Sequence, residues 1–267
     1  MGAADRWRTD LEAWALPQEL LDGVDRSPYG WPAQLFQRMR RFETPTSPTI
    51  ERTAEPAGPG GSVLDVGAGT GRIGLALAGR GHPVTFVERN ERMLEGLRHD
   101  AATLGVDPVV VVGSWPDVDV EPHDVVVCAN VVYDVQDIGP FVSGLHRAAR
   151  RAVVVEATPG HPWSHLTPYY RVMHGLERPR GPVVEDLGAV IAETVGAAPS
   201  IERWPAPAGL RFADMQELVD LMAMRLLVPG DRWSELMDLL TPDVVEDDGW
   251  LVLGRTEREM CTVTWRT

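Results

Sequence analysis

Residues 62–78, SVLDVGAGTGRIGLALA, constrain the fold more than any other part of the chain. Val63–Val66 is a short, mainly apolar run beside glycines, which predicts a buried strand. Three glycines at alternate positions begin at Gly67, where the backbone must turn tightly and let a ligand come close. A helical apolar pattern then begins at Arg72. A strand, a glycine turn and a helix together predict free backbone N–H groups and a positive helix end beside a nucleotide-type ligand.

The spacing of the glycines narrows the choice of ligand. Gly69, Gly71 and Gly74 match the dinucleotide fingerprint G-x-G-x-x-G. The fuller pattern, however, has an acid, Asp65, two positions before Gly67. A pyrophosphate gains nothing from a nearby carboxylate, so this acid disfavours a dehydrogenase. A glycine-rich turn without any ligand is the other interpretation that stays open.

The pattern Asp65-x-Gly67-x-Gly69-x-Gly71 resembles motif I of the class I S-adenosylmethionine-dependent methyltransferases. The resemblance implies an α/β fold, a Rossmann-like doubly wound sheet of seven strands with the last strand antiparallel. It also implies S-adenosylmethionine as cofactor, S-adenosylhomocysteine as product, and methyl transfer to an oxygen, nitrogen, sulfur or carbon atom. In such proteins the acid and the glycine loop hold the methionine end, which here means Asp65, Gly67, Ala68 and Gly69. A side chain at Gly67 is expected to fill space that the cofactor needs.

A second acid stands where the cofactor's ribose is expected. Glu88 ends an apolar run and lies 21 positions after Gly67, near the spacing at which a fingerprint acid binds ribose hydroxyls. A carboxylate accepts both hydroxyl hydrogens. The resemblance adds five further cofactor contacts, at the ribose, the adenine or the methyl group: Arg89, Met93, Ser114, Trp115 and Asn130. Ser114-Trp115 replaces the acid that many members carry there, and a core role for Trp115 stays open.

Histidines and aromatic residues gather after the expected fifth strand, 152–155. His161 and His165 are candidate general bases because imidazole titrates near neutral pH, and a purely structural role stays open for each. Tyr133 is a third catalytic candidate, since it follows a strand at the carboxyl edge of the sheet. A metal site is disfavoured because no third ligand is suitably spaced. Four aromatic residues predict a planar or apolar substrate, namely Tyr29, Trp31, Trp163 and Tyr169.

The chain divides into an N-terminal helical extension, 1–58, and a methyltransferase domain, 59–267. The proline-rich residues 43–49 are expected to break the chain, leaving one helical turn at 50–54. Residues 207–249 predict an inserted helical cap that ends in an acidic surface turn. Residues 1–45 and this cap are expected to meet as a lid over the carboxyl ends of the strands. Such enclosure favours a small-molecule substrate. The alternatives are a protein or RNA methyltransferase with an open cleft, or a non-catalytic cofactor-binding protein.

Composition excludes some chemistry and some partners. The chain contains no lysine, so a lysine Schiff base or lysine general base is excluded. Its formal net charge of -14 disfavours nucleic acid as a partner. Two cysteines, a charged N-terminal stretch and no membrane-length apolar run predict a cytoplasmic protein without membrane contact. Nothing in these residues predicts the oligomeric state.

Overall fold

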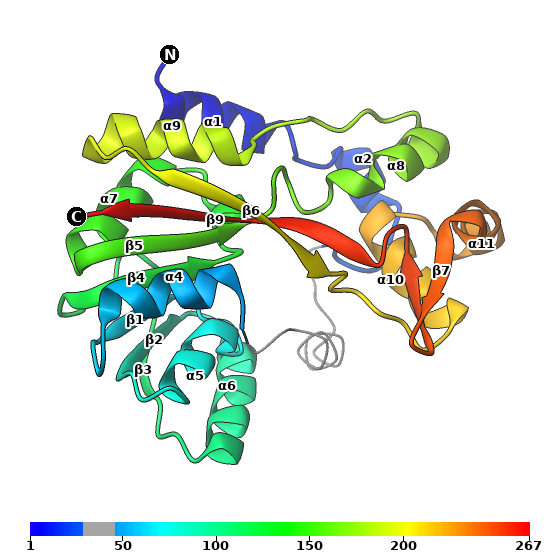
Figure 1. Cartoon of the computed structure of the whole chain (residues 1–267). Helices are drawn as coiled ribbons and strands as arrows, with labels where there is room; N and C mark the ends of the chain where they lie inside the picture. Colours follow the sequence, from blue (N-terminus) through cyan, green and yellow to red (C-terminus); the bar gives the residue numbers. More distant parts are fainter. Residues whose placement is uncertain (29–45) are drawn as a thin grey trace.

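The computed structural model describes residues 1–28 and 46–267, and it is built around a seven-stranded sheet (Figure 1). The strand order is β3-β2-β1-β4-β5-β9-β6, with β9 antiparallel to both of its neighbours. The predicted doubly wound sheet with an antiparallel last strand is therefore confirmed. The strands are β1 Val63–Val66, β2 Val84–Glu88, β3 Val109–Val112, β4 His123–Ala129, β5 Ala149–Ala157, β6 Ser200–Pro207 and β9 Glu257–Arg266. The predicted substrate residues Tyr29 and Trp31 lie outside the described residues.

Helices cover both faces of the sheet (Figure 1). Along β5, Val153 and Val155 pack into the core on one face, and Val154 packs into the core on the other. Both faces of a parallel sheet are buried in this way because its crossover helices lie against them. One face carries α1 Ala3–Glu12, α7 Ile138–Ala148 and α9 Val184–Val195, and the other carries α4 Pro48–Ala57, α5 Arg72–Ala78 and α6 Glu91–Leu104.

A second apolar core lies beside the sheet and combines parts of the chain that are distant in sequence (Figure 1). We call it the second core. It contains α8 Thr167–His174, α10 Met215–Leu226, α11 Trp233–Leu240 and the hairpin of β7 Val244–Asp247 and β8 Trp250–Leu253. Short connecting elements are α2 Gln18–Asp22, η1 Val132–Asp134, η2 Ser164–Leu166, η3 Gly230–Arg232 and η4 Thr241–Asp243. The predicted cap, residues 207–249, therefore packs together with α8, and the β7–β8 hairpin belongs to the same core.

The β7–β8 hairpin confirms a surface turn in the acidic segment, at Asp248–Gly249, and shows a strand, β7, that was not predicted before it. Asp247 pairs with Trp250 across a two-residue turn, Asp248–Gly249. Both turn residues have positive φ, 50° and 76°. This Asp-Gly turn matches the twist of two antiparallel strands. The acidic residues of β7 did not look like a strand in the sequence, although the apolar strand β8, with which β7 pairs, follows directly after the turn.

The predicted chain break at 43–49 is wrong at its end, where α4 begins. Ser47 caps this helix by accepting the Ile50 N–H at 3.3 Å, and Pro48 occupies its first turn. Serine before proline is a favourable helix start, because proline lacks only an N–H that has no helical partner there. The helix runs through Ala57 instead of making a single turn.

The N-terminal segment contacts both the sheet helices and the second core. α1 packs on α7 and α9, and the Ala3 N–H donates to the Glu193 carboxylate at 2.6 Å. Further along, Leu16 packs against the second core, and Arg225 of α10 donates to the Pro28 carbonyl. The segments 1–28 and 207–249 therefore touch. Their action as a lid stays a prediction.

Candidate functional site

The glycine loop joins β1 to α5, and its backbone donors are already used within the protein. Gly67 and Ala68 donate to the Val87 carbonyl at 2.9 and 3.0 Å. Gly69 donates to Glu88 Oε2 at 2.9 Å, and Gly71 donates to the Ala68 carbonyl at 2.8 Å. The prediction of free N–H groups is therefore wrong for these four residues. A pyrophosphate needs such donors, and these four residues do not supply them.

The space around the glycines shows which side of the loop is open. A Cβ at Gly67 would lie 2.4 Å from Val131 Cγ2, so a side chain there would strike the protein. The structure thus gives this glycine a packing reason, and the space predicted for the cofactor stays a prediction. A Cβ at Gly69 would have no atom of the described residues within 4 Å, and its φ of +56° suits glycine. Open space therefore faces Gly69.

Asp65 is buried beneath the loop and fixes the start of α5. Its Oδ2 accepts the Gly74 N–H at 2.9 Å. Burial raises the pKa of Asp65 to about 7, and the charges of Glu88 and Glu156 add to this while Arg72 opposes it. The observed role of this carboxylate is to hold helix against strand. Contact with a methionine moiety stays a prediction.

Asp65→Asn is expected to remove a pH dependence of stability between about pH 4 and pH 7. The unfolded carboxyl has a pKa near 3.8, and the folded value is about 7, so the folded state binds this proton more tightly. Its contribution to stability is full below the lower value and is lost as the pH rises to the upper one. Denaturant unfolding of both proteins across this range measures the difference, which should favour the variant increasingly as pH rises. The amide oxygen of asparagine still accepts the Gly74 N–H.

Asp124→Asn provides a control of opposite sign. The Ser62 backbone N–H donates to Asp124 Oδ2 at 2.8 Å and lowers the pKa of this carboxyl. The contribution of the Asp124 carboxylate to folding stability is therefore present at neutral pH and lost as the pH falls. A constant stability difference between wild type and Asp65→Asn across the range would contradict the Asp65 prediction.

Glu88 lies at the end of β2 and reaches the glycine loop. Its Oε2 accepts the Gly69 N–H, and its Oε1 accepts the Asn90 N–H at 2.8 Å. A carboxylate oxygen accepts more than one hydrogen bond, so both oxygens can still receive hydroxyls. Arg89 is exposed, and Met93 is half-buried in the first turn of α6. Their contacts with a cofactor, and that of Glu88, stay predictions.

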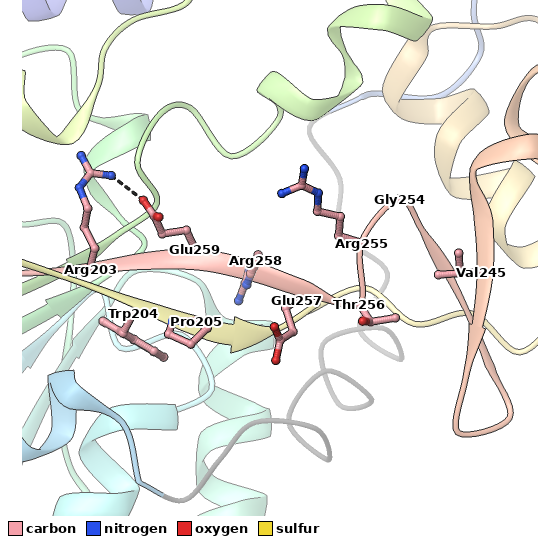
Figure 2. Close-up of a pocket in the computed structure, with 10 residues that line it drawn as sticks. All are labelled: Arg203, Trp204, Pro205, Val245, Gly254, Arg255, Thr256, Glu257, Arg258 and Glu259. Carbon is pink, nitrogen blue, oxygen red and sulfur yellow. Dashed lines mark hydrogen bonds and ion pairs between the residues drawn. The ribbon is translucent and has the colours of Figure 1, made fainter.

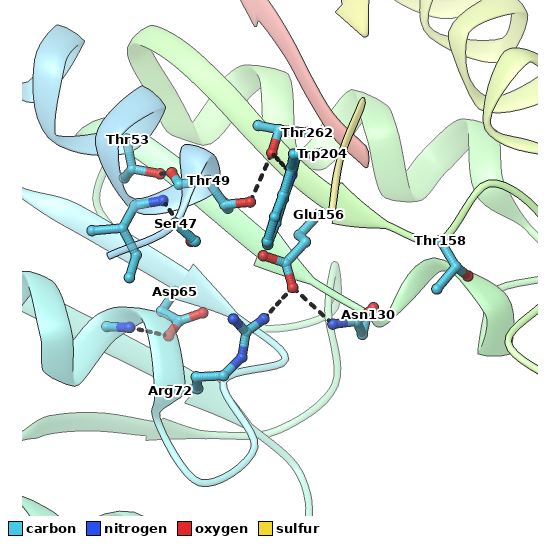
Figure 3. Close-up of polar contacts among 12 residues, drawn as sticks. Ser47, Thr49, Thr53, Asp65, Arg72, Asn130, Glu156, Thr158, Trp204 and Thr262 are labelled. Atoms are coloured by element: carbon cyan, nitrogen blue, oxygen red, sulfur yellow. Dashed lines mark hydrogen bonds and ion pairs between the residues drawn. The ribbon is translucent and has the colours of Figure 1, made fainter. Parts of the chain in front are cut away.

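A polar cluster that the sequence did not reveal joins the glycine loop to the ends of β4 and β5 (Figure 3). Glu156 is 1% exposed, and its Oε1 accepts hydrogen bonds from the Arg72 guanidinium and from Asn130 Nδ2, the latter at 3.0 Å. The Asn130 N–H also donates to the Glu156 carbonyl at 2.9 Å. Asn130 has a φ of +58°, which is uncommon outside glycine. The one sequence signal for this cluster was an arginine directly after the last loop glycine.

Tyr133 and His161 lie together, and the structure constrains both. The Tyr133 hydroxyl accepts the Thr158 N–H and donates to the Thr158 carbonyl at 2.9 Å, while burial raises the pKa of the phenol. His161 stacks on Trp14 with ring centroids 3.8 Å apart and meets the edge of Tyr133 at 5.8 Å. Burial, reinforced by the positive charge of Arg178, lowers the pKa of His161 to about 4, so the ring is neutral at pH 7.

The two histidines differ in tautomer. His161 Nδ1 accepts the Trp163 N–H at 3.3 Å, so its proton is on Nε2. His165 Nδ1 lies 2.9 Å from the Pro162 carbonyl, which only accepts, so Nδ1 carries the proton. The basic lone pair of the exposed His165 ring is therefore on Nε2. Catalytic roles for these residues stay predictions.

The remaining predicted residues lie apart from the loop. Trp163 carries the Arg225 guanidinium over its ring at 4.4 Å. Tyr169 is buried in the second core, donates to Asp243 Oδ2 at 2.7 Å, and has its pKa raised by burial. Ser114 is exposed, whereas Trp115 packs against the core and donates to the Phe141 carbonyl of α7 at 3.3 Å. The packing of Trp115 supports the core interpretation that the sequence left open.

A pocket of ≈ 630 Å³ lies where β6 and β9 approach the second core (Figure 2). Trp204 lines this pocket and donates from its ring to Thr262 Oγ1 at 3.0 Å. Thr262 in turn is the strand partner of Glu156. The other lining residues are Arg203, Pro205, Val245, Gly254, Arg255, Thr256, Glu257, Arg258 and Glu259. Through Trp204 and Thr262, the pocket adjoins the strand position of Glu156.

The described residues contain neither a metal-binding group nor a membrane-spanning helix. No group of three His, Cys, Asp or Glu side chains in residues 1–28 and 46–267 could hold a metal ion. Within the same residues, no helix has the length and apolar character needed to cross a membrane.

Known proteins share this sequence pattern and fold. Residues 63–152 match the sequence model of a family described as a methyltransferase domain, and the match includes the glycine loop, Glu88 and Asn130. Residues 63–152 therefore carry the sequence pattern of a methyltransferase domain. No curated protein sequence matches the chain.

Solved structures have a similar fold. Magnesium protoporphyrin IX methyltransferase from Synechocystis, with bound SAH, has a TM-score of 0.56 at 15% identity, covering 90% of this chain and 91% of that chain. A structure described as the conversion of a disulfide bond into a thioacetal group during echinomycin biosynthesis has a TM-score of 0.54 at 16% identity, covering 88% and 91%. At these identities the likeness establishes the fold alone, and the activity and the substrate are argued from the site.

Proposed function

We infer that this methyltransferase binds S-adenosylmethionine at the glycine loop and transfers the methyl group to a small, planar or apolar molecule. One observation carries the cofactor assignment. The loop donors are used internally, and three carboxylates, Asp65, Glu88 and Glu156, surround the loop with Arg72 among them. A positively charged sulfonium nucleoside suits such a site, whereas a pyrophosphate is repelled by it.

Each cofactor residue has a task that follows from its position. Glu88 holds the ribose hydroxyls beside Gly69, whose outer side is open. Asp65 keeps α5 and the loop in place, and Asn130 lies at the end of β4, next to where the methyl group is transferred. Met93 and Ser114 border the adenine. When bound, the cofactor supplies an activated methyl group, so alignment of the two reactants contributes much of the rate.

The histidine tautomers support His165 over His161 as a general base for a protonated nucleophile. His165 presents a lone pair on Nε2, whereas His161 uses its lone pair on the Trp163 N–H. The Tyr133 hydroxyl is held by Thr158 and is better suited to positioning than to proton transfer. A nucleophile that is already unprotonated needs none of the three.

The acceptor site is proposed at the pocket of ≈ 630 Å³, a size typical of small-molecule sites. Trp204 offers a planar apolar surface there. Trp163 and Tyr169 belong to the second core and do not line the pocket, so their contact with the substrate stays a prediction. The net charge of -14 favours a small molecule over RNA. A cytoplasmic location stays a prediction.

Calorimetry of the purified chain with S-adenosylmethionine, S-adenosylhomocysteine and NAD tests the cofactor. We expect both sulfur nucleosides to bind and NAD not to bind. Binding of NAD alone would refute the proposal. Incubation of a small-molecule extract with the chain and S-adenosylmethionine should then give a product heavier by one methylene in mass spectrometry. Cofactor binding without any methylated product, in extracts or on proteins, would favour a non-catalytic role.

A further inference from the structure

Glu156 is a buried carboxylate in which one oxygen accepts two hydrogen bonds and the other accepts none from the described residues (Figure 3). Its Oε1 receives hydrogen bonds from Arg72 and Asn130. Its Oε2 is shielded from solvent and has no hydrogen-bond partner among residues 1–28 and 46–267. Buried polar atoms are nearly always hydrogen-bonded, and a charged acceptor is among the most costly to leave without a partner. The unused oxygen indicates a ligand that donates a hydrogen bond here.

The position of Glu156 shows which ligand group this is. Arg72 directly follows the glycine loop, and Asn130 precedes Val131, against which Gly67 packs. Glu156 therefore stands at the junction of the loop with the carboxyl ends of β4 and β5. The Arg72 side chain is 24% exposed, so this cation can be reached from solvent. A guanidinium and a carboxylate stand side by side next to the proposed methionine end of the cofactor.

We propose that Glu156 Oε2 accepts a hydrogen bond from the ammonium group of the cofactor's methionine part. This inference rests on the proposed function. The amino-acid end of S-adenosylmethionine carries an ammonium and a carboxylate on one carbon, which matches the opposite charges of Glu156 and Arg72. The thioadenosine part carries no ammonium, so the contact discriminates between the two halves of the ligand.

Calorimetry with two ligands isolates the contact. S-adenosylhomocysteine has the amino-acid end, and 5′-methylthioadenosine lacks it. In Glu156→Gln, the affinity for S-adenosylhomocysteine should fall at least about tenfold, and that for 5′-methylthioadenosine should change less than about threefold. Glu202→Gln is the matched control, because Glu202 is also a strand partner of Thr262 and pairs with Arg52 at 2.9 Å. Both ligands should bind this control like wild type.

An equal loss of affinity for both ligands in Glu156→Gln would overturn the proposal, and so would no loss for either. If wild type does not bind S-adenosylhomocysteine, the result refutes the proposed function and not only the Glu156 contact. A measurement on wild type alone covers the case in which the variant does not fold. The analogue of S-adenosylhomocysteine with hydrogen in place of the amino group should bind at least about tenfold more weakly than the parent. Equal affinity would refute the ammonium contact.

Discussion

Replacing Gly74 with valine is expected to lower the free energy of unfolding by about 3 kcal/mol or more, or to prevent folding. A Cβ at this position would lie 2.4 Å from Phe86 Cε1 and 2.7 Å from Asp65 Oδ2. Both neighbours are buried, and the Gly74 N–H is bonded to Asp65. The added atoms would separate α5 from β1 and β2. Denaturant unfolding followed by circular dichroism measures the loss.

Gly79→Ala is the control within the same helix. Gly79 caps the end of α5, and a Cβ there would meet nothing closer than the Leu75 carbonyl oxygen at 3.4 Å. The free energy of unfolding of Gly79→Ala should stay within about 0.5 kcal/mol of the wild-type value. A Gly74→Val protein as stable as wild type would show that α5 does not pack as closely on the strands as the structure indicates.

The elements around the glycine loop could be predicted from sequence because each is marked locally. Val63–Val66 is an apolar run between glycines, and the structure has β1 over the same residues. The helix predicted from Arg72 begins there, since Gly71 takes a φ of +82° immediately before it. Glu88 ends β2 as its spacing predicted. In each case, residues within a few positions determine where the element ends.

The features that sequence analysis missed depend on distant residues. The loop N–H groups are used by Val87 and Glu88, which belong to the next strand. Glu156 meets Arg72 across 84 positions of sequence, and no local pattern announces such a pair. The β7–β8 hairpin was missed for another reason, because charged residues at exposed strand positions look like a surface turn. The loop hydrogen bonds and the Glu156–Arg72 pair both depend on contacts between parts of the chain that are distant in sequence.

The structure also distinguishes candidates that the sequence had treated alike. His161 and His165 are four positions apart and had equal standing as bases. Stacking of Trp14, from the N-terminal segment, on His161 buries that ring and lowers its pKa to about 4. His165 has a more exposed ring, although burial lowers its pKa as well, and its lone pair is on Nε2. A contact made across nearly 150 positions thus separates two neighbouring histidines.

Glu88→Ala is expected to cost about 2 to 5 kcal/mol of affinity for S-adenosylhomocysteine, because two charge-assisted hydrogen bonds to the ribose are lost. Calorimetry measures this loss. Glu91→Ala is the control, since Glu91 lies three positions further on, is exposed, and pairs with Arg98 at 3.4 Å. The affinity of Glu91→Ala for S-adenosylhomocysteine should differ from that of wild type by less than about twofold.

A second ligand separates the ribose contact from the support that Glu88 gives to the loop. Glu88 also accepts the N–H groups of Gly69 and Asn90, so alanine could weaken binding by loosening the backbone. An analogue of S-adenosylhomocysteine without the ribose hydroxyls should bind wild type much more weakly than the parent compound. Glu88→Ala should bind the two compounds almost equally, because the partner of the hydroxyls is absent. If both proteins discriminate alike, or if Glu88→Ala loses less than about tenfold, the carboxylate acts on the loop and not on the ribose.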